Sequence, residues 1–212
     1  MFDLAGKIQD LVVIIPVFLL ALTIHEFAHA WVANRLGDPT ARLQGRLTLN
    51  PLSHLDPLGT LAIVLIGFGW AKPVPVDFRY LARPRRDMML IAAAGPASNI
   101  VMATAGAFLF RTIPWTGWGA EWAWLIKPLM VMIYITVGAN VVLAVFNLLP
   151  IPPLDGSRVL SGLLPLRHAI SYSRLEPYGG LIIFLLFITG VMNPVFGVAQ
   201  HTLTRALFQM WG

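Results

Sequence analysis

Long stretches without Lys, Arg, Asp or Glu dominate the hydrophobic pattern of this chain. A helix needs roughly 20 apolar residues to cross about 30 Å of hydrocarbon. Four stretches reach that length, and they lie at residues 11–34, 88–110, 128–150 and 177–204. Only Glu26 interrupts the first stretch, and Pro194 predicts a kink or break in the last. The pattern predicts an all-α polytopic membrane protein with about four full transmembrane helices.

A fifth apolar stretch, at residues 57–71, is shorter than the others. As a helix its 15 residues would extend at most about 22 Å, and glycines at 59, 67 and 69 weaken it further. Such a segment is too short to be an independent span. We therefore expect 57–71 to form a re-entrant or interfacial segment.

Composition narrows the class of protein further. Of 212 residues, 57% are hydrophobic and 12% are charged, about half the charged fraction of an average soluble domain. An ordinary soluble enzyme and a disordered chain are both disfavoured. We expect one integral-membrane domain over residues 1–212, with a core at 8–165 and an additional C-terminal helical region at 177–204. The absence of cysteine excludes cysteine-ligated zinc and Fe–S clusters.

The basic residues predict an orientation. Eleven of the 15 Lys and Arg residues fall in three loops, at 35–56, 72–87 and 155–176. Short loops rich in Lys and Arg face the cytosol, and the three loops share one side only if 57–71 does not cross. In so apolar a chain, the net charge of +5 indicates basic loops against an anionic leaflet rather than a nucleic-acid partner.

The acidic residue inside the first predicted helix belongs to a metal-binding pattern. His25, Glu26 and His29 form an H-E-x-x-H motif. Residues i and i+4 share one face of a helix, so the two imidazoles can hold one metal ion, and Glu26 beside them can take a proton from water at that metal. The alternative is that both histidines are buried, hydrogen-bonded core residues.

Two histidines leave a catalytic zinc site incomplete, because such sites usually have three protein ligands. Asp155 is the better third candidate among the remaining residues. It follows three prolines, at 150, 152 and 153, that end the third predicted helix on the cytosolic side, and Gly156 permits a tight bend after it. The first helix also runs toward the cytosol, so both parts of the site approach from one side. The alternative is an ordinary turn aspartate.

The motifs together resemble those of the site-2 proteases, the family of zinc intramembrane metalloproteases, in a compact form without a PDZ domain. The resemblance covers about residues 15–165. It rests on HEFAH at 25–29, GPASN at 95–99, NLLPIPPLDG at 147–156, NPLSHLDPLGT at 50–60 and GWAKPVPV at 69–76.

The resemblance implies a function and a cofactor. It implies one Zn²⁺ per chain held by His25, His29 and Asp155, with Glu26 as the general base. It also implies hydrolysis of peptide bonds in or near transmembrane segments, as in regulated intramembrane proteolysis. The partner would be a transmembrane protein substrate, with the need for an earlier cut left open. The chain has no room for the PDZ domain that many relatives carry, which leaves substrate recruitment open.

Two asparagines at membrane depth are candidates for contact with the substrate. Asn147 or Asn99 could donate to the oxyanion or hold the substrate backbone, and the family pattern favours Asn147. The alternative for both is hydrogen bonding between helices.

A proline-rich segment is the candidate substrate-binding strand. Its residues are Lys72, Pro73, Val74, Pro75 and Val76. Each proline pushes its predecessor toward an extended conformation, which predicts a small β-like loop near the active site. An unwound substrate could pair with its edge. A basic surface loop is the alternative.

Other functions remain to be distinguished. A divalent-metal transporter would also carry ionisable residues inside the membrane, but no internal repeat is visible. A catalytically silent scaffold relative would share the motifs. We expect a multi-pass protein of the bacterial inner membrane with its active site toward the cytosol, and its oligomeric state is left open.

Overall fold

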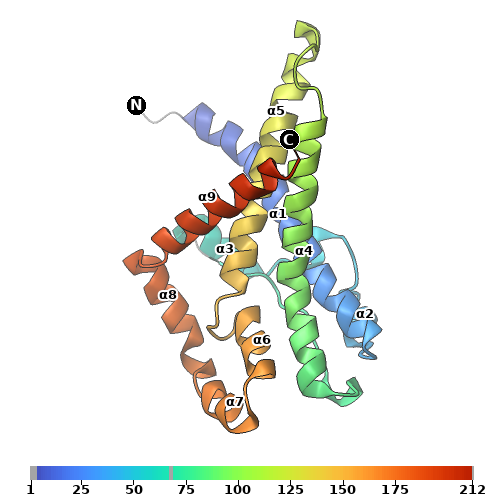
Figure 1. Cartoon of the computed structure of the whole chain (residues 1–212), viewed down its shortest axis with the longest axis vertical. Coiled ribbons are helices and arrows are strands. Elements are labelled where there is room, and N and C mark those ends of the chain that lie inside the picture. The colour runs from blue at the N-terminus through green and yellow to red at the C-terminus, as the bar shows by residue number, and fades with distance from the viewer. Residues whose placement is uncertain (1–3, 67–68, 212) are drawn as a thin grey trace.

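Three long helices form the centre of the molecule. A computed structural model describes residues 4–66 and 69–211 (Figure 1). The helices α1 (Leu4–Arg35), α4 (Pro84–Thr112) and α5 (Ala123–Asn147) contain segments that are long and apolar enough to cross a membrane. Each packs against the other two. These helices match the first three predicted spans and confirm the all-α membrane fold.

Small residues let two of these helices approach closely. Ala103 and Ala107 of α4 pack with Val137 and Val141 of α5 in one fully buried cluster. Close contact between small side chains is how helices associate where lipid and side chain are equally apolar.

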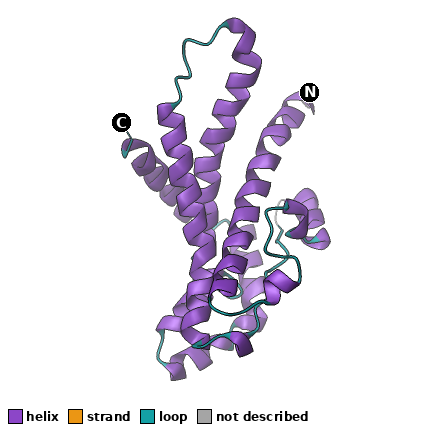
Figure 2. Ribbon diagram, turned by 90° about the vertical axis from the view of Figure 1, so that its right-hand side faces the viewer, coloured by secondary structure: helices purple, strands orange, loops and turns teal. Residues whose placement is uncertain are grey.

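The remaining helices are shorter, and they lie between the long ones or follow α5. They are α2 (Thr40–Leu43), η1 (Pro51–Ser53), α3 (Pro57–Ile66), η2 (Phe78–Tyr80), η3 (Ala120–Trp122), α6 (Asp155–Leu163), α7 (Leu166–Ser173), η4 (Glu176–Tyr178), α8 (Gly179–Thr189) and α9 (Asn193–Gln209). The described residues contain no strand (Figure 2). Segment 72–77 is an extended loop instead.

The segment around α3 returns to its starting point. Its ten helical residues extend only about 15 Å. The residues that flank it, Leu55 and Ala71, form an antiparallel bridge, and Lys72 N donates to His54 O at 2.9 Å. Both ends therefore lie together, as expected for a re-entrant segment.

The C-terminal stretch is a bent pair rather than a straight helix. The two parts, residues 166–189 and 193–209, meet at 81°. Gly190 ends α8 in the left-handed conformation, with a φ of +65°, and Pro194 lies in the first turn of α9. The predicted break at Pro194 is displaced toward the N-terminus because proline fits the first turn of a helix and glycine fits its end. Figure 1 shows α8 set apart from the central helices and α9 crossing them.

The two ends of the bundle differ in character. The end of α1, the start of α4 and α6–α7 lie at one end, and the α4–α5 connection lies at the other (Figure 1). That connection and the start of α5 carry Trp115, Trp118, Trp122 and Trp124. The predicted basic loops thus gather at the end opposite these four tryptophans, an arrangement typical of a membrane protein with an aromatic belt at one interface.

Candidate functional site

The H-E-x-x-H motif lies on α1 and faces the interior of the bundle. His25, Glu26 and His29 are 5%, 8% and 7% exposed. His25 and His29 are one helical turn apart, and their rings meet edge to face with centroids 4.6 Å apart. The spacing therefore brings both rings to one point, as expected from helical geometry.

The start of α6 brings a carboxylate to the same point. The end of α5 at Asn147 and the turn that follows place Asp155 as the first residue of α6. A Cβ on Gly156 would overlap the backbone carbonyl of Leu148. Glycine is thus needed here for close backbone approach rather than for the bend that the sequence suggested.

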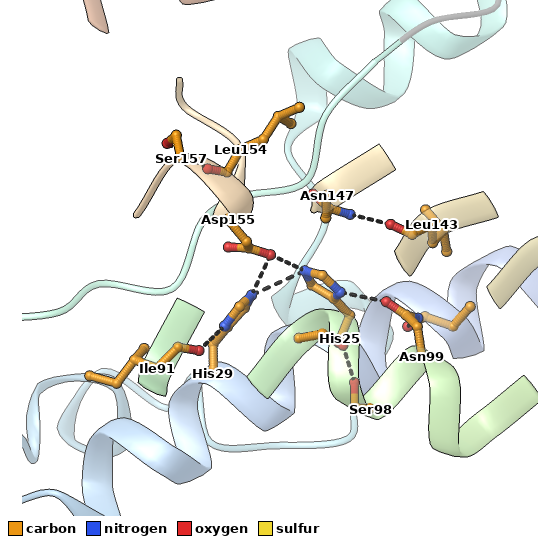
Figure 3. A network of polar contacts seen from close by, with 12 residues as sticks. His25, His29, Ile91, Ser98, Asn99, Leu143, Asn147, Leu154, Asp155 and Ser157 are labelled. Carbon is orange, nitrogen blue, oxygen red and sulfur yellow. Dashed lines mark hydrogen bonds and ion pairs between the residues drawn. The ribbon is translucent and has the colours of Figure 1, made fainter. Parts of the chain in front are cut away.

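Three ligand atoms converge from these elements (Figure 3). His25 Nε2 lies 3.0 Å from His29 Nε2, and Asp155 Oδ2 lies 3.1 Å and 3.2 Å from these two nitrogens. Tetrahedral zinc with bonds of 2.0–2.1 Å would separate its ligands by about 3.3 Å. The described residues thus contain one group, His25, His29 and Asp155, with the spacing of a metal site.

The tautomer of His25 follows from a chain of amides. Asn140 Nδ2 donates to Thr136 O at 2.9 Å, so its Oδ1 accepts from Asn99 Nδ2 at 2.8 Å. Asn99 Oδ1 then faces His25 Nδ1 at 2.7 Å and can only accept. The chain fixes the proton on Nδ1 and leaves the lone pair of Nε2 for a metal.

His29 is oriented in the same way by a backbone carbonyl. Its Nδ1 donates to Ile91 O of α4 at 2.7 Å. Both Nε2 atoms therefore present lone pairs toward each other and toward Asp155 Oδ2, a buried oxygen that has no well-formed hydrogen bond. Three acceptors at about 3 Å repel one another unless a cation lies between them, so the site fits a metal ion.

The glycine of the GPASN motif makes room for the imidazoles. A Cβ built on Gly95 would overlap ring atoms of both His25 and His29. Gly95 is thus a close-packing position that lies directly against the two rings.

A cavity of about 710 Å³ connects the metal site to the other predicted elements. Its walls include His25, Glu26, His29, Asp155, Asn147, Pro73, Val74 and Val76, together with Gly180, Ile183 and Phe184 of α8. Residues of the extended loop and the two histidines thus line the same cavity.

The two candidate asparagines differ in whether they reach the cavity. Asn147 lines the cavity, and its Nδ2 donates to Leu143 O within its own helix at 3.0 Å. Asn99 is fully buried, and both ends of its amide are engaged with His25 and Asn140. The geometry does not support Asn99 as an oxyanion donor. It places Asn99 behind the histidine. Its Nδ2 donates to Asn140 Oδ1 at 2.8 Å and to Ala21 O at 3.4 Å, so neither amide hydrogen is left for a substrate.

Several residues of the site were not found from the sequence. Asn140 gave only the signal of an amide inside an apolar helix, and the Ile91 carbonyl gave none. Asp38 and Arg46 gave no signal beyond the charge of a loop, yet both are buried beside segment 72–77.

Comparisons with known proteins agree with this geometry. Two similar proteins are both named "Putative zinc metalloprotease". They are YwhC of Bacillus subtilis, 42% identical over 90% of each chain, and Rip2 of Mycolicibacterium smegmatis, 33% identical over 86% of this chain and 69% of the relative. The profile of Peptidase family M50 matches residues 113–190. The chain belongs to peptidase family M50, the site-2 protease family. No solved structure matches the chain.

Membership in family M50 accounts for the combination of features seen here. The matched profile spans α5, α6 and the whole first part of the C-terminal pair, and so includes Asp155. The alignments with the two relatives cover 90% and 86% of the chain, so they extend well beyond the profile. The protein is therefore a membrane protein of a metalloprotease family, with a group of residues that can hold one metal ion.

Proposed function

We propose that this protein is a zinc metalloendopeptidase that hydrolyses peptide bonds in or near transmembrane segments, as in regulated intramembrane proteolysis. The observation that carries the proposal is the convergence of three lone-pair-bearing ligand atoms beside Glu26 in a cavity within an apolar bundle. We assign His25 Nε2, His29 Nε2 and Asp155 Oδ2 as the ligands of one Zn²⁺.

Each residue of the site then has a task in peptide hydrolysis. Zinc, when bound, supplies a Lewis acid that polarises the scissile carbonyl and makes water more acidic. Glu26 lines the cavity next to His25, where its carboxylate accepts the proton of the attacking water and later passes it to the leaving amine. Asn99 and the Ile91 carbonyl hold the two imidazoles in place throughout.

The substrate in this proposal is a transmembrane protein that unwinds locally. A peptide bond inside a helix is shielded, so the chain must become extended and its backbone groups must find partners. The loop at 72–76 borders the cavity and offers such an edge. Asn147 lines the same cavity and can turn its Nδ2 toward a substrate carbonyl or the oxyanion.

We also propose a location in the bacterial inner membrane with the metal site toward the cytosol. The end of the bundle that carries the basic loops is the end from which Asp155 enters the site (Figure 1). Basic loops remain on the cytosolic side, so water would reach the site from there.

Purified wild-type protein and Glu26→Gln, assayed with a panel of single-span substrates together with metal analysis, test the function. We expect the variant to keep its zinc and to lose cleavage by about a thousandfold. Glu176→Gln, at an exposed residue of η4, is the control and should cleave like wild type.

Three results would contradict the proposal. If Glu26→Gln cleaved as well as the wild type, Glu26 could not be the general base. Absence of cleavage by the wild type would favour a silent scaffold. Zinc uptake into vesicles by the wild-type protein, without cleavage, would favour a transporter.

A further inference from the structure

Two charged side chains are buried beside the cavity but outside the metal site. Asp38 is 0% exposed and Arg46 is 5% exposed. Asp38 Oδ1 accepts from Thr40 N at 2.9 Å at the start of α2. After α2 the chain turns through Gly45, whose φ is +69°, and Arg46 N donates back to Ala41 O at 2.8 Å. This compact turn after α1 directs both charges toward segment 72–77.

Both side chains bind the backbone of that segment. Arg46 Nη2 donates to Lys72 O at 2.6 Å and Nη1 donates to Pro73 O at 3.2 Å. Asp38 Oδ2 accepts from Asp77 N at 2.8 Å. A positive group thus holds two carbonyls at one end of the segment, and a negative group holds an N–H at the other. Such charge-assisted bonds are stronger than neutral ones.

The backbone between these two ends is left without partners among the described residues. Pro73 and Pro75 have no N–H group to donate. Val74 and Val76 each carry an N–H and a C=O for which the described part of the chain supplies no hydrogen bond. The side chains of both valines line the cavity. The segment is therefore fixed at its ends and open along one edge, which suits it to pair with an extended peptide.

Stability of the fold is a weak reason to bury these charges. Arg46 Nε is buried and has no partner in the described part of the structure, so its guanidinium is not saturated. Burial lowers the pKa of Arg46, and attraction to Glu26 opposes that effect. A buried, incompletely paired ion seldom adds to stability and calls for another explanation.

We propose that Arg46 and Asp38 are positioning residues that hold segment 72–77 as the docking edge for an extended peptide substrate. The proposal rests on the proposed proteolytic function. It adds that the affinity for the substrate backbone is set by two side chains that touch neither metal nor scissile bond. Loss of either should loosen the edge and leave the metal ligands in place, because His25, His29 and Asp155 are held by other elements.

The test combines kinetics with a spin-label measurement that does not depend on cleavage. The chain contains no cysteine, so Lys72→Cys provides a single site for a nitroxide at an exposed side chain of the segment. Spin-label mobility, zinc content, KM and kcat are measured for Arg46→Gln, Arg46→Lys and Asp38→Asn. Arg42→Gln is the matched control, because Arg42 is an exposed arginine of the neighbouring α2.

We expect Arg46→Gln to raise KM about tenfold, with kcat nearly unchanged and zinc stoichiometric. Arg46→Lys keeps the charge but cannot span two carbonyls as a fork, so it should give a smaller rise in KM. Asp38→Asn should act in the same direction from the other end of the segment. Label mobility should increase in all three variants and stay at the wild-type level in Arg42→Gln.

Separate results would overturn the proposal and the underlying function. Unchanged mobility in Arg46→Gln and Asp38→Asn would show that these residues do not hold the segment. Increased mobility with unchanged KM would show that the segment does not bind substrate. A fall in kcat with loss of zinc would assign the residues to the metal site instead. Failure of the wild type to cleave counts against the proteolytic function alone, and the mobility comparison then decides whether the residues hold the segment.

Discussion

The cavity has two walls that are built by opposite means. We call them the metal wall, with His25, His29 and Asp155, and the loop wall, segment 72–77. The metal wall comes from helices, and amide and carbonyl groups within the bundle fix its rings. The loop wall has no regular structure, and buried charges hold its two ends. An ion needs ligands at fixed positions, whereas an edge that binds peptide backbone needs free N–H and C=O groups.

Removing a metal ligand should have the largest effect, because it disables the metal wall and leaves the loop wall intact. Asp155→Ala leaves two imidazoles, so we expect loss of stoichiometric zinc and at least about a thousandfold loss of cleavage. Metal analysis and a cleavage assay check both. Glu121→Ala, near the tryptophan-rich end, is the control. If Asp155→Ala retained one zinc per chain, the assignment of the third ligand would be wrong.

Filling the space under the rings should have the next largest effect. Gly95→Ala places a Cβ against both imidazoles, so the rings must move away from the positions in which they can bind one metal ion. We expect zinc affinity to fall about a hundredfold. Gly197→Ala makes the same substitution in α9 where no atom lies within 4 Å of the new Cβ, and it should bind zinc normally. Competition with a chelator measures both affinities. Equal affinities would show that Gly95 does not limit the position of the rings.

The chain of amides behind His25 should have a graded effect. Asn99→Ala removes the acceptor for His25 Nδ1, so we expect zinc affinity to fall by about 10–100-fold. Asn140→Ala removes only the partner of Asn99 and should have a smaller effect in the same assay. KM for substrate should change little in either variant. An equal or larger loss in Asn140→Ala would contradict the order of the chain.

A surface ion pair next to the loop wall should have the smallest effect. Arg79 donates to Asp77 at 2.6 Å, and this hydrogen bond lowers the pKa of Asp77 to about 2. Any stability from this depressed pKa is present above the ordinary carboxyl range and is lost only as pH falls through about 2. In Arg79→Gln we expect that pKa to rise, as followed by NMR of labelled carboxylates, while KM at neutral pH stays unchanged. A raised KM would mean that the loop wall also depends on this exposed pair.

The metal wall was largely readable from the sequence. Helical periodicity alone places His25 and His29 on one face, and their apolar surroundings make Glu26 conspicuous. Asp155 stood out through the prolines before it, although a turn aspartate was the alternative. The length of the stretch at 57–71 predicted a re-entrant segment, and the bridge between Leu55 and Ala71 brings its two ends together as expected. Local patterns suffice wherever the partners lie on one helix or where length against bilayer thickness decides the outcome.

Tertiary structure alone decided which polar groups meet across long separations in the chain. Asn99, on α4, looked like a substrate ligand but lies behind His25, because α1 and α5 together supply the partners of its whole amide. Arg46 looked like one of many loop charges but reaches carbonyls 26 and 27 residues away. The scarcity of charge, visible in the sequence, identified the membrane and the metal site. Packing of separate segments decided the partners of the remaining buried charges, because a buried polar group must be satisfied by whatever the fold places beside it.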